Sequence, residues 1–453
     1  MHVINPTTGE KGQQFELHTD EEVEAKLKLA AGSQAQWAQT PLHHRAELLR
    51  RVAESLRSQK RPLAELMTRE MGKPIAQGES EAEKCAWVCD YYAENAAAFL
   101  AREDIETDAS ESYVAHRPYG VVLAIMPWNF PFWQLFRHAA PGLMAGNAIL
   151  LKHAANVPGC AEAIERIFVE AGFLHGLVTN LRMDHDVSER VIRDPRVAGV
   201  TLTGSTAAGK KIASIAGEAL KKTVLELGGS DPYVILDDAD LEEAVEACVK
   251  SRLINNGQSC IAAKRFIVTE KNHDAFVERM VARMADQSMG DPMEESTDVG
   301  PQAREDLRDE LHAQVEKSVE AGATVALGGE IPDRPGFFYP PTVLTGVAKG
   351  MPAYDEELFG PVAAVIRAKD EEEAIAIAND TSFGLGAAVF TADVARGREI
   401  AETRLHAGCC FVNTFVRSDP RLPFGGVGES GYGRELARQG ILEFVNQKTV
   451  YVA

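Results

Sequence analysis

The feature that most constrains the fold is an alternation of short apolar segments and amphipathic segments. Residues 121–128 (VVLAIMPW) have the composition of a buried strand, and residues 132–146 have the periodicity of a helix. The same pair recurs at 147–154 and 158–172. Strands that alternate with helices form βαβ units, whose strands run parallel in one sheet. The sequence therefore predicts an α/β fold.

The alternation continues in the second half of the chain, for example at 361–370, 371–383 and 386–392. A chain of 453 residues is long enough for two or three domains. We therefore expect two α/β domains, with the boundary near Gly228 and Gly229. A helical block from 20 to 99 precedes them, and Thr19 followed by acidic residues has the chemistry of a helix N-cap.

Composition and charge exclude several classes of protein. The formal charge is −20, whereas a nucleic-acid-binding surface requires a basic patch. No secretory signal is expected at the start, and the uncharged stretch 118–136 contains three prolines that break it as a membrane-spanning helix. The seven cysteines are odd in number and irregular in spacing, which favours reduced thiols in a cytoplasmic protein. We expect no metal site.

One cysteine stands at the end of the polar stretch Asn255–Cys260 (NNGQSC), just before an apolar run. A thiol at such a turn is a candidate nucleophile. The alternative is a small buried side chain, because free cysteine is among the most buried residue types.

Three other positions are candidates for chemistry, each with a structural alternative. Glu226 ends an apolar run before two glycines and suits a general base, or it is a surface residue at a hinge. Asn129 in MPWNFPFW suits an oxyanion donor, or it is a turn asparagine. Gly204 and Ser205 lie where a strand passes into a helix, which favours anion binding but also fits a plain tight turn.

These motifs occur in a familiar order. MPWNFP, LLKHA, TGSTAAG, LELGGSDP, NNGQSC, EELFGPV and PFGGVGESGYGRE together resemble the NAD(P)-dependent aldehyde dehydrogenase superfamily, and the resemblance covers essentially the whole chain. It implies two Rossmann-type three-layer α/β/α domains with a small β oligomerisation arm. The NAD(P)-binding domain would comprise 1–103 and 119–227, the catalytic domain 228–443, and the arm 104–118 and 444–453.

The resemblance also assigns catalytic roles. Cys260 would attack the aldehyde as a thiolate, with the oxyanion held by the Asn129 side chain and the Cys260 backbone N–H. Hydride transfer to the nicotinamide would leave a thioester, which water activated by Glu226 would hydrolyse. Glu435 would relay a proton, with a structural salt bridge as an equal alternative.

The cofactor would be NAD, NADP or both. The residues implied to hold it are Trp128, Lys152, Ala155, Gly204, Ser205, Leu227, Glu357 and Phe359. NAD-preferring members often have a glutamate three residues after the lysine, where this chain has Ala155. Because no carboxylate there would repel a 2′-phosphate and Lys152 would pair with it, we predict that NADP is accepted and that NAD is also used.

The resemblance is closest to the short bacterial succinate-semialdehyde dehydrogenases. In that subgroup Arg137 would bind the distal carboxylate, with Ser418 or Arg417 as a second anchor. The alternative for Arg137 is a surface ion pair. Rival substrates are glutarate semialdehyde, aminoaldehydes and a broad range of aldehydes. CoA acylation, a cysteine hydrolase and a catalytically silent structural member are weaker alternatives. The family forms dimers or dimer pairs, so we expect a homodimer or homotetramer.

Overall fold

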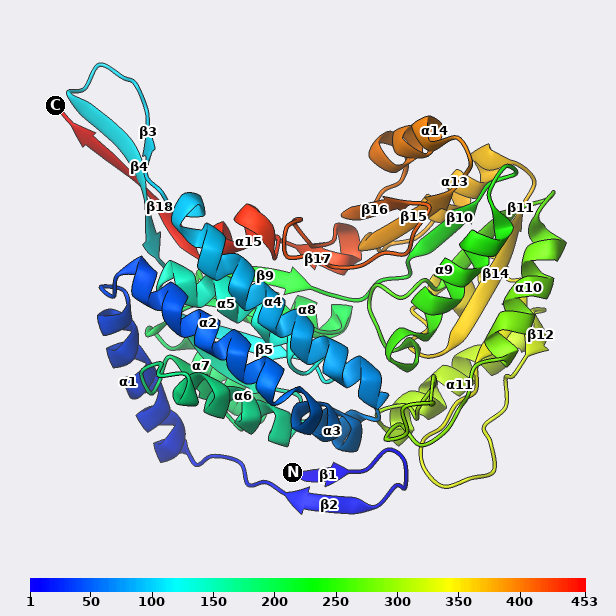
Figure 1. Ribbon diagram of the computed structural model, residues 1–453, viewed down its shortest axis with the longest axis horizontal. Coiled ribbons are helices and arrows are strands. Elements are labelled where there is room, and N and C mark those ends of the chain that lie inside the picture. The colour runs from blue at the N-terminus through cyan, green and yellow to red at the C-terminus, as the bar shows by residue number, and fades with distance from the viewer.

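The computed structural model describes residues 1–453 and contains two open, mostly parallel sheets (Figure 1). The first sheet has the order β17-β9-β8-β5-β6-β7. Its parallel strands are β5 (Val121–Met126), β6 (Ala148–His153), β7 (Val178–Asn180), β8 (Val197–Thr203) and β9 (Lys222–Glu226). The chain builds outward from β5 to β7, then returns to place β8 on the other side of β5. Ligands of such sheets bind where the order reverses, here at the carboxyl ends of β5 and β8.

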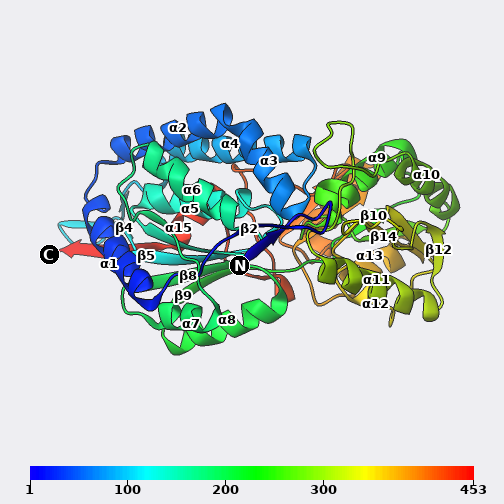
Figure 2. The same cartoon turned by 90° about the horizontal axis from the view of Figure 1, so that it is seen from below.

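Helices cover both faces of this sheet, as Figure 2 shows. One face carries α5 and α6 with α2, α3 and α4 outside them, and the other carries α7 and α8. All residues of α5 are buried, because the helix lies between the sheet and α4. The bounds are α1 (Asp20–Trp37), α2 (Leu42–Ser58), α3 (Lys60–Met71), α4 (Ile75–Phe99), α5 (Trp133–Ala145), α6 (Pro158–Glu170), α7 (His185–Arg193) and α8 (Thr206–Glu218). The cap expected at Thr19 is present as a reciprocal pair of hydrogen bonds with Glu22.

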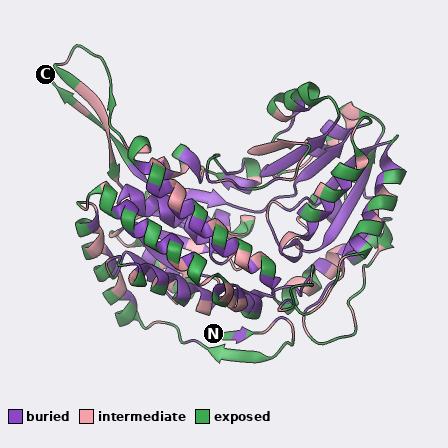
Figure 3. Ribbon diagram, viewed as in Figure 1, coloured by how far each residue is buried: buried purple, intermediate pink, exposed green.

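The second sheet has the order β12-β13-β14-β11-β10-β15-β16. Only its edge strand β12 runs antiparallel to its neighbour. The strands are β10 (Pro232–Ile235), β11 (Arg265–Thr269), β12 (Thr324–Leu327), β13 (Thr342–Thr345), β14 (Val362–Ala368), β15 (Gly386–Phe390) and β16 (Cys409–Val412). The central strands are buried on both faces (Figure 3). Successive residues alternate between two apolar clusters, with Tyr233 in one and Val234 in the other.

Helices α9 (Leu241–Leu253) and α10 (His273–Ala285) cover one face of the second sheet. Helices α11 (Glu305–Glu320), α12 (Pro352–Asp355) and α13 (Glu371–Asn379) cover the other. Shorter elements are η1 (Ile254–Gly257), α14 (Val394–Glu399), η2 (Ile400–Arg404) and η3 (Gly428–Ser430). None of the helices is long and apolar enough to cross a membrane.

The end of the chain returns to the first sheet. Strand β17 (Gly431–Tyr432) pairs with β9, and helix α15 (Ala437–Glu443) packs against α4 and α5. These residues were expected with the second unit in the range 228–443, an expectation that followed chain order. Residues 431–432 instead pair with a strand of the first sheet, although they are distant from it in sequence. Gly431 allows this pairing, because a side chain at Gly431 would collide with the backbone of Leu225 and its φ is 104°.

A three-stranded arm extends away from the body of the molecule (Figure 1). Strand β18 (Val445–Val452) pairs along its length with β4 (Glu111–Pro118), and β3 (Glu103–Asp104) forms the third strand. The tip of this arm is exposed (Figure 3), including the apolar residues Ile105, Tyr451 and Val452. A separate hairpin of β1 (His2–Ile4) and β2 (Lys11–Gln14) begins the chain.

Candidate active site

A cavity of about 390 Å³ opens at the point where the strand order of the first sheet reverses. The loop after β5 contributes Trp128 and Asn129, and the loop after β8 contributes Gly204 and Ser205. Leu227, just after β9, completes this side. Ser205 is also the N-cap of α8, so the cavity meets the positive end of a helix dipole.

The second unit supplies the opposite wall of this cavity. Glu357 and Phe359 line it, and the Phe359 ring packs edge-on against Trp128 with 5.8 Å between centroids. Side chains of α11 also face it: Leu307, Glu310, Leu311 and Gln314. The sequence did not mark these α11 residues, because their spacing is that of any amphipathic helix.

Cys260 lines this cavity and also a second one, of about 530 Å³. The side chains that line the second cavity include four cationic ones (Lys84, Arg137, Lys250 and Arg417), three acidic ones (Glu81, Glu295 and Asp298) and four aromatic ones (Phe130, Trp133, Phe415 and Phe424). Ser418 lines it as well. Cys260 thus lies between two cavities. The first is formed in part by the ends of strands of the first sheet, and the second contains the side chains just named.

The polar stretch before Cys260 has an unusual backbone. Asn255, Asn256 and Gly257 all have positive φ, at 53°, 58° and 76°. Asparagine tolerates this region better than most residues, and a side chain at Gly257 would collide with the backbone of Gly360. Asn256 is fully buried and donates to the carbonyls of Gly72 and Pro301. Asn255, Asn256 and Gly257 are therefore residue types that suit this tight, buried turn.

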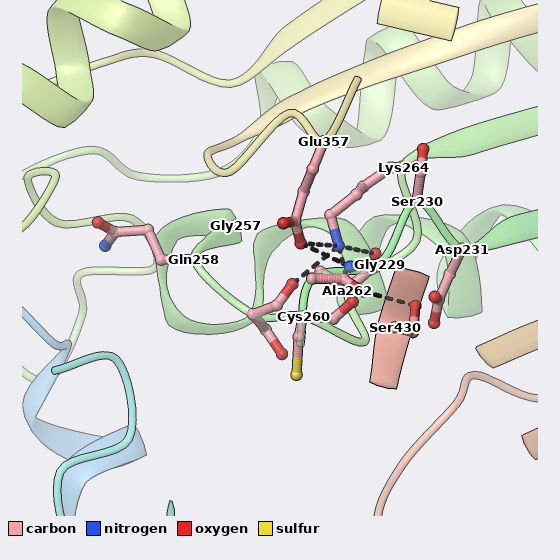
Figure 4. Close-up of polar contacts among 12 residues, drawn as sticks. Gly229, Ser230, Asp231, Gly257, Gln258, Cys260, Ala262, Lys264, Glu357 and Ser430 are labelled. Atoms are coloured by element: carbon pink, nitrogen blue, oxygen red, sulfur yellow. Dashed lines mark hydrogen bonds and ion pairs between the residues drawn. The ribbon is translucent and has the colours of Figure 1, made fainter. Parts of the chain in front are cut away.

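The buried side chain of Lys264 also stabilises the turn that contains Cys260, through hydrogen bonds to backbone carbonyls (Figure 4). Lys264 Nζ donates to the carbonyls of Ser259 (3.0 Å), Cys260 (2.8 Å) and Ala262 (3.2 Å). It also pairs with Glu357 at 3.3 Å, while Glu357 accepts from the Gly229 N–H at 3.0 Å. The Cys260 side chain points away from this ammonium. Lys264 positions the backbone around Cys260 and was not identified from the sequence.

Asn129 connects the first sheet to the cysteine turn. Its Nδ2 donates to the Gln258 carbonyl at 3.1 Å, and Asn255 Nδ2 donates to both the Asn129 carbonyl (2.7 Å) and the Gln258 carbonyl (3.0 Å). Asn129 and Cys260 line the same cavity. The amide is thus held near the thiol, as an oxyanion donor requires.

The thiol of Cys260 is protonated at neutral pH in this state. Burial raises the pKa of Cys260 to about 12, against the opposing charges of Arg137 and Lys264. Attack as a thiolate therefore requires that a base accept the proton.

Glu226 and Glu435 are two buried carboxyl groups, and Glu226 is near enough to affect the pKa of Cys260. Burial raises the pKa of Glu226 well above its usual range, and the charge of Glu435 raises it further. Neither oxygen of Glu226 has a hydrogen-bond partner, and its side chain lines neither cavity. Glu435, whose pKa burial also raises, is in ion-pair contact with Arg137. The structure thus places Glu226 close to the ion pair of Glu435 and Arg137.

Arg137 is buried, not at the surface as the alternative interpretation had it. Besides its contact with Glu435, Nη2 donates to Thr203 Oγ1 at 3.1 Å. The side chain does line the second cavity, but its charge is offset by Glu435. Ser418, the second expected anchor, is buried and accepts a hydrogen bond from Lys84 at 2.7 Å.

Two expected cofactor residues lie outside the first cavity. Lys152 is on β6, half-buried and without an ion-pair partner, and burial lowers its pKa. Ala155 is exposed in the loop that follows. The other expected cofactor residues all line the cavity: Trp128, Gly204, Ser205, Leu227, Glu357 and Phe359.

Comparison with known proteins shows the family to which the chain belongs. Residues 1–450 match the model of the Aldehyde dehydrogenase family. The chain is 49% identical over 450 residues to the probable succinate-semialdehyde dehydrogenase [NADP(+)] of Synechocystis sp., covering 99% of each chain. It is 49% identical to the succinate semialdehyde dehydrogenase [NAD(P)+] of Escherichia coli, covering 99% of this chain and 97% of that one.

A solved structure is also similar throughout. The succinic semialdehyde dehydrogenase from Streptococcus pyogenes in complex with NADP+ superposes with a TM-score of 0.97 at 39% identity, covering 100% of this chain and 99% of that one. The protein belongs to the aldehyde dehydrogenase family. The predicted family and fold class are therefore confirmed.

Proposed function

We propose that the protein oxidises succinate semialdehyde to succinate with NADP, and also uses NAD. The observation that carries this proposal is the place of Cys260 between two cavities, one suited to a nucleotide and one in which the Lys84 ammonium has no acidic partner. A substrate with a distal carboxylate fits the second cavity better than an aminoaldehyde does, because the Lys84 ammonium would attract the carboxylate and repel the positive charge of an aminoaldehyde. The names and cofactors of the relatives support the same substrate and coenzyme.

The first cavity fits a nicotinamide dinucleotide. Gly204 and Ser205 at the start of α8 would hold the pyrophosphate, and Trp128, Leu227, Glu357 and Phe359 would surround the nicotinamide end. Lys152 would reach the adenosine ribose and pair with a 2′-phosphate. When bound, the cofactor supplies an acceptor for the hydride of the aldehyde carbon.

Side chains of the protein would carry out the attack on the aldehyde, the stabilisation of the oxyanion and the hydrolysis of the thioester. Cys260 Sγ attacks the aldehyde carbon after its proton passes to solvent water, and the oxyanion receives hydrogen bonds from Asn129 Nδ2 and the Cys260 N–H. Loss of hydride from this adduct leaves a thioester on Cys260. Glu226 then removes a proton from water, which attacks the thioester and releases succinate and the thiol. Because Glu226 lines neither cavity here, its side chain must turn toward Cys260 for this step.

Initial rates test the proposal. Succinate semialdehyde, glutarate semialdehyde, butanal and 4-aminobutanal are each compared with NAD and with NADP. We expect succinate semialdehyde to exceed butanal by well over tenfold in kcat/KM. Equal values for butanal would indicate a broad-range enzyme, and faster 4-aminobutanal an aminoaldehyde dehydrogenase. A coenzyme preference above about a thousandfold in kcat/KM, equivalent to about 4 kcal/mol, would contradict dual use.

The exposed arm supports a homo-oligomer. Strands β18, β4 and β3 project from the body, and an exposed strand edge with apolar residues favours pairing with another chain. Truncation after Phe444 removes β18 and should convert a dimer or tetramer into smaller species, as measured by light scattering. An unchanged mass would contradict the role of the arm. The cytoplasmic location stays a prediction.

A further inference from the structure

Lys84 places an ammonium group inside the second cavity. The residue lies on α4, is half-buried and lines the cavity that Cys260 shares. Its Nζ donates to Ser418 Oγ at 2.7 Å and lies 4.3 Å from the centroid of the Trp133 ring. Both neighbours line the same cavity, so the ammonium is fixed at its wall.

No carboxylate pairs with this ammonium, because the nearby acidic groups are engaged elsewhere. Glu81, one turn earlier on α4, pairs with the buried Lys73 and accepts from the N–H groups of Phe132 and Trp133. Asp419, next to Ser418, pairs with Arg421 at 2.6 Å. Lys84 forms hydrogen bonds only to Ser418, a neutral group. A buried cation without a counter-charge is costly unless a ligand supplies one.

Arg137 is a weaker candidate than Lys84 for binding an anionic group of a ligand in this cavity. Its guanidinium is already paired with Glu435 and bonded to Thr203, so the pair brings little net charge to the cavity. Lys84 has two further N–H groups, since only one is used by Ser418. The Ser418 hydroxyl accepts from Lys84 and keeps its own hydrogen to donate.

We propose that Lys84, together with the Ser418 hydroxyl, binds the carboxylate at the far end of the substrate and sets the preference for acid aldehydes. The ammonium would contact one carboxylate oxygen and the hydroxyl the other. Trp133 stacks beside the ammonium and shields the pair from water, which strengthens the interaction. The inference rests on the proposed function, because it names the substrate-anchoring residue of the same site.

The test is the ratio of kcat/KM for succinate semialdehyde to that for butanal, two aldehydes of the same chain length. Lys84→Met keeps the length of the side chain and removes its charge. We expect the ratio to fall about thirtyfold or more, chiefly through KM for succinate semialdehyde, in the range of a lost charged hydrogen bond. Lys84→Arg keeps a cation and should recover part of the ratio.

Lys250→Met is the matched control. Lys250 lines the same cavity but is exposed, and its ammonium lies near the Phe415 ring, 5.3 Å from the centroid. We expect this variant to keep the ratio within about threefold, since exposed charges contribute little. Equal ratios for the wild type and Lys84→Met would overturn the inference.

The two proposals fail in different ways. If the wild type itself does not prefer succinate semialdehyde, the proposed function is wrong. If it does and Lys84→Met keeps that preference, the assignment of Lys84 alone is wrong. Should Lys84→Met not fold, Lys84→Gln and the pH dependence of the wild-type ratio decide the same question.

Discussion

Glu435 and Arg137, far apart in the chain, form an ion pair in which both side chains are buried. The pair lies beside Glu226, whose pKa is raised by burial and by the charge of Glu435 and lowered by that of Arg137. The arginine expected to bind substrate thus acts on the proposed base, and the salt bridge considered for Glu435 is present.

Replacing Arg137 by leucine should impair every aldehyde substrate. The change leaves Glu435 unpaired and lets the pKa of Glu226 rise further, so less of the base is ionised at neutral pH. We expect kcat for succinate semialdehyde and butanal to fall by similar factors, about tenfold or more. The free energy of unfolding should fall by about 3–5 kcal/mol.

The double variant R137L/E435Q is the control, because it removes both charges and should recover part of the lost stability. Steady-state kinetics and chemical denaturation measure both effects. A loss confined to succinate semialdehyde and to KM would instead identify Arg137 as the carboxylate anchor.

Glu226→Gln should separate the two halves of the reaction. Without a base, thioester hydrolysis slows by about 10²–10⁴ in turnover. Formation of the thioester does not need water, so a burst of about one NADPH per active site should remain in stopped-flow absorbance. Absence of the burst would mean that Glu226 is the base that accepts the Cys260 proton, whose pKa is raised to about 12.

The preference for an acid aldehyde should decline at high pH. Burial lowers the pKa of Lys84 to about 8, and the charge of Arg137 adds to this, while Glu81 and Asp419 oppose it. Only the protonated form attracts a carboxylate, so the preference is full below this pKa and is lost above it.

The ratio of kcat/KM for succinate semialdehyde to that for butanal cancels the ionisations of Cys260 and Glu226, which serve both substrates. We expect it to fall as pH rises from 7 to about 9.5. A ratio that stays constant over this interval would argue against Lys84.

Lys264→Met should lower both stability and activity. Three backbone carbonyls and Glu357 would lose their buried donor, at a cost of about 3 kcal/mol or more in unfolding free energy. Lys349→Met is the matched control, because Lys349 is exposed and pairs with Asp380. Normal kcat in Lys264→Met would show that the turn holds Cys260 without it.

Ala155→Glu tests the coenzyme prediction. Ala155 is exposed, three residues after Lys152, and a carboxylate there would repel a 2′-phosphate. We expect kcat/KM with NADP to fall about tenfold or more while NAD is less affected. Equal changes for the two coenzymes, measured at fixed saturating aldehyde, would place the 2′-phosphate elsewhere.

Much of the fold was predictable because local patterns report it directly. The periodicity of 132–146 matches α5, and the acidic residues after Thr19 match the cap of α1. The two-residue strand β17 was missed, because two residues are too few to carry a pattern and the strand exists only because β9 offers hydrogen bonds.

The sequence by itself determined the α/β class and the family, because these depend on residue types and their order. Only the tertiary structure decided which charges remain available. Arg137 is neutralised by Glu435 and Lys84 is left without an acidic partner, although both are basic residues on helices. An ion pair depends on distance in space, and residues far apart in the chain come within reach only when the sheets and helices pack.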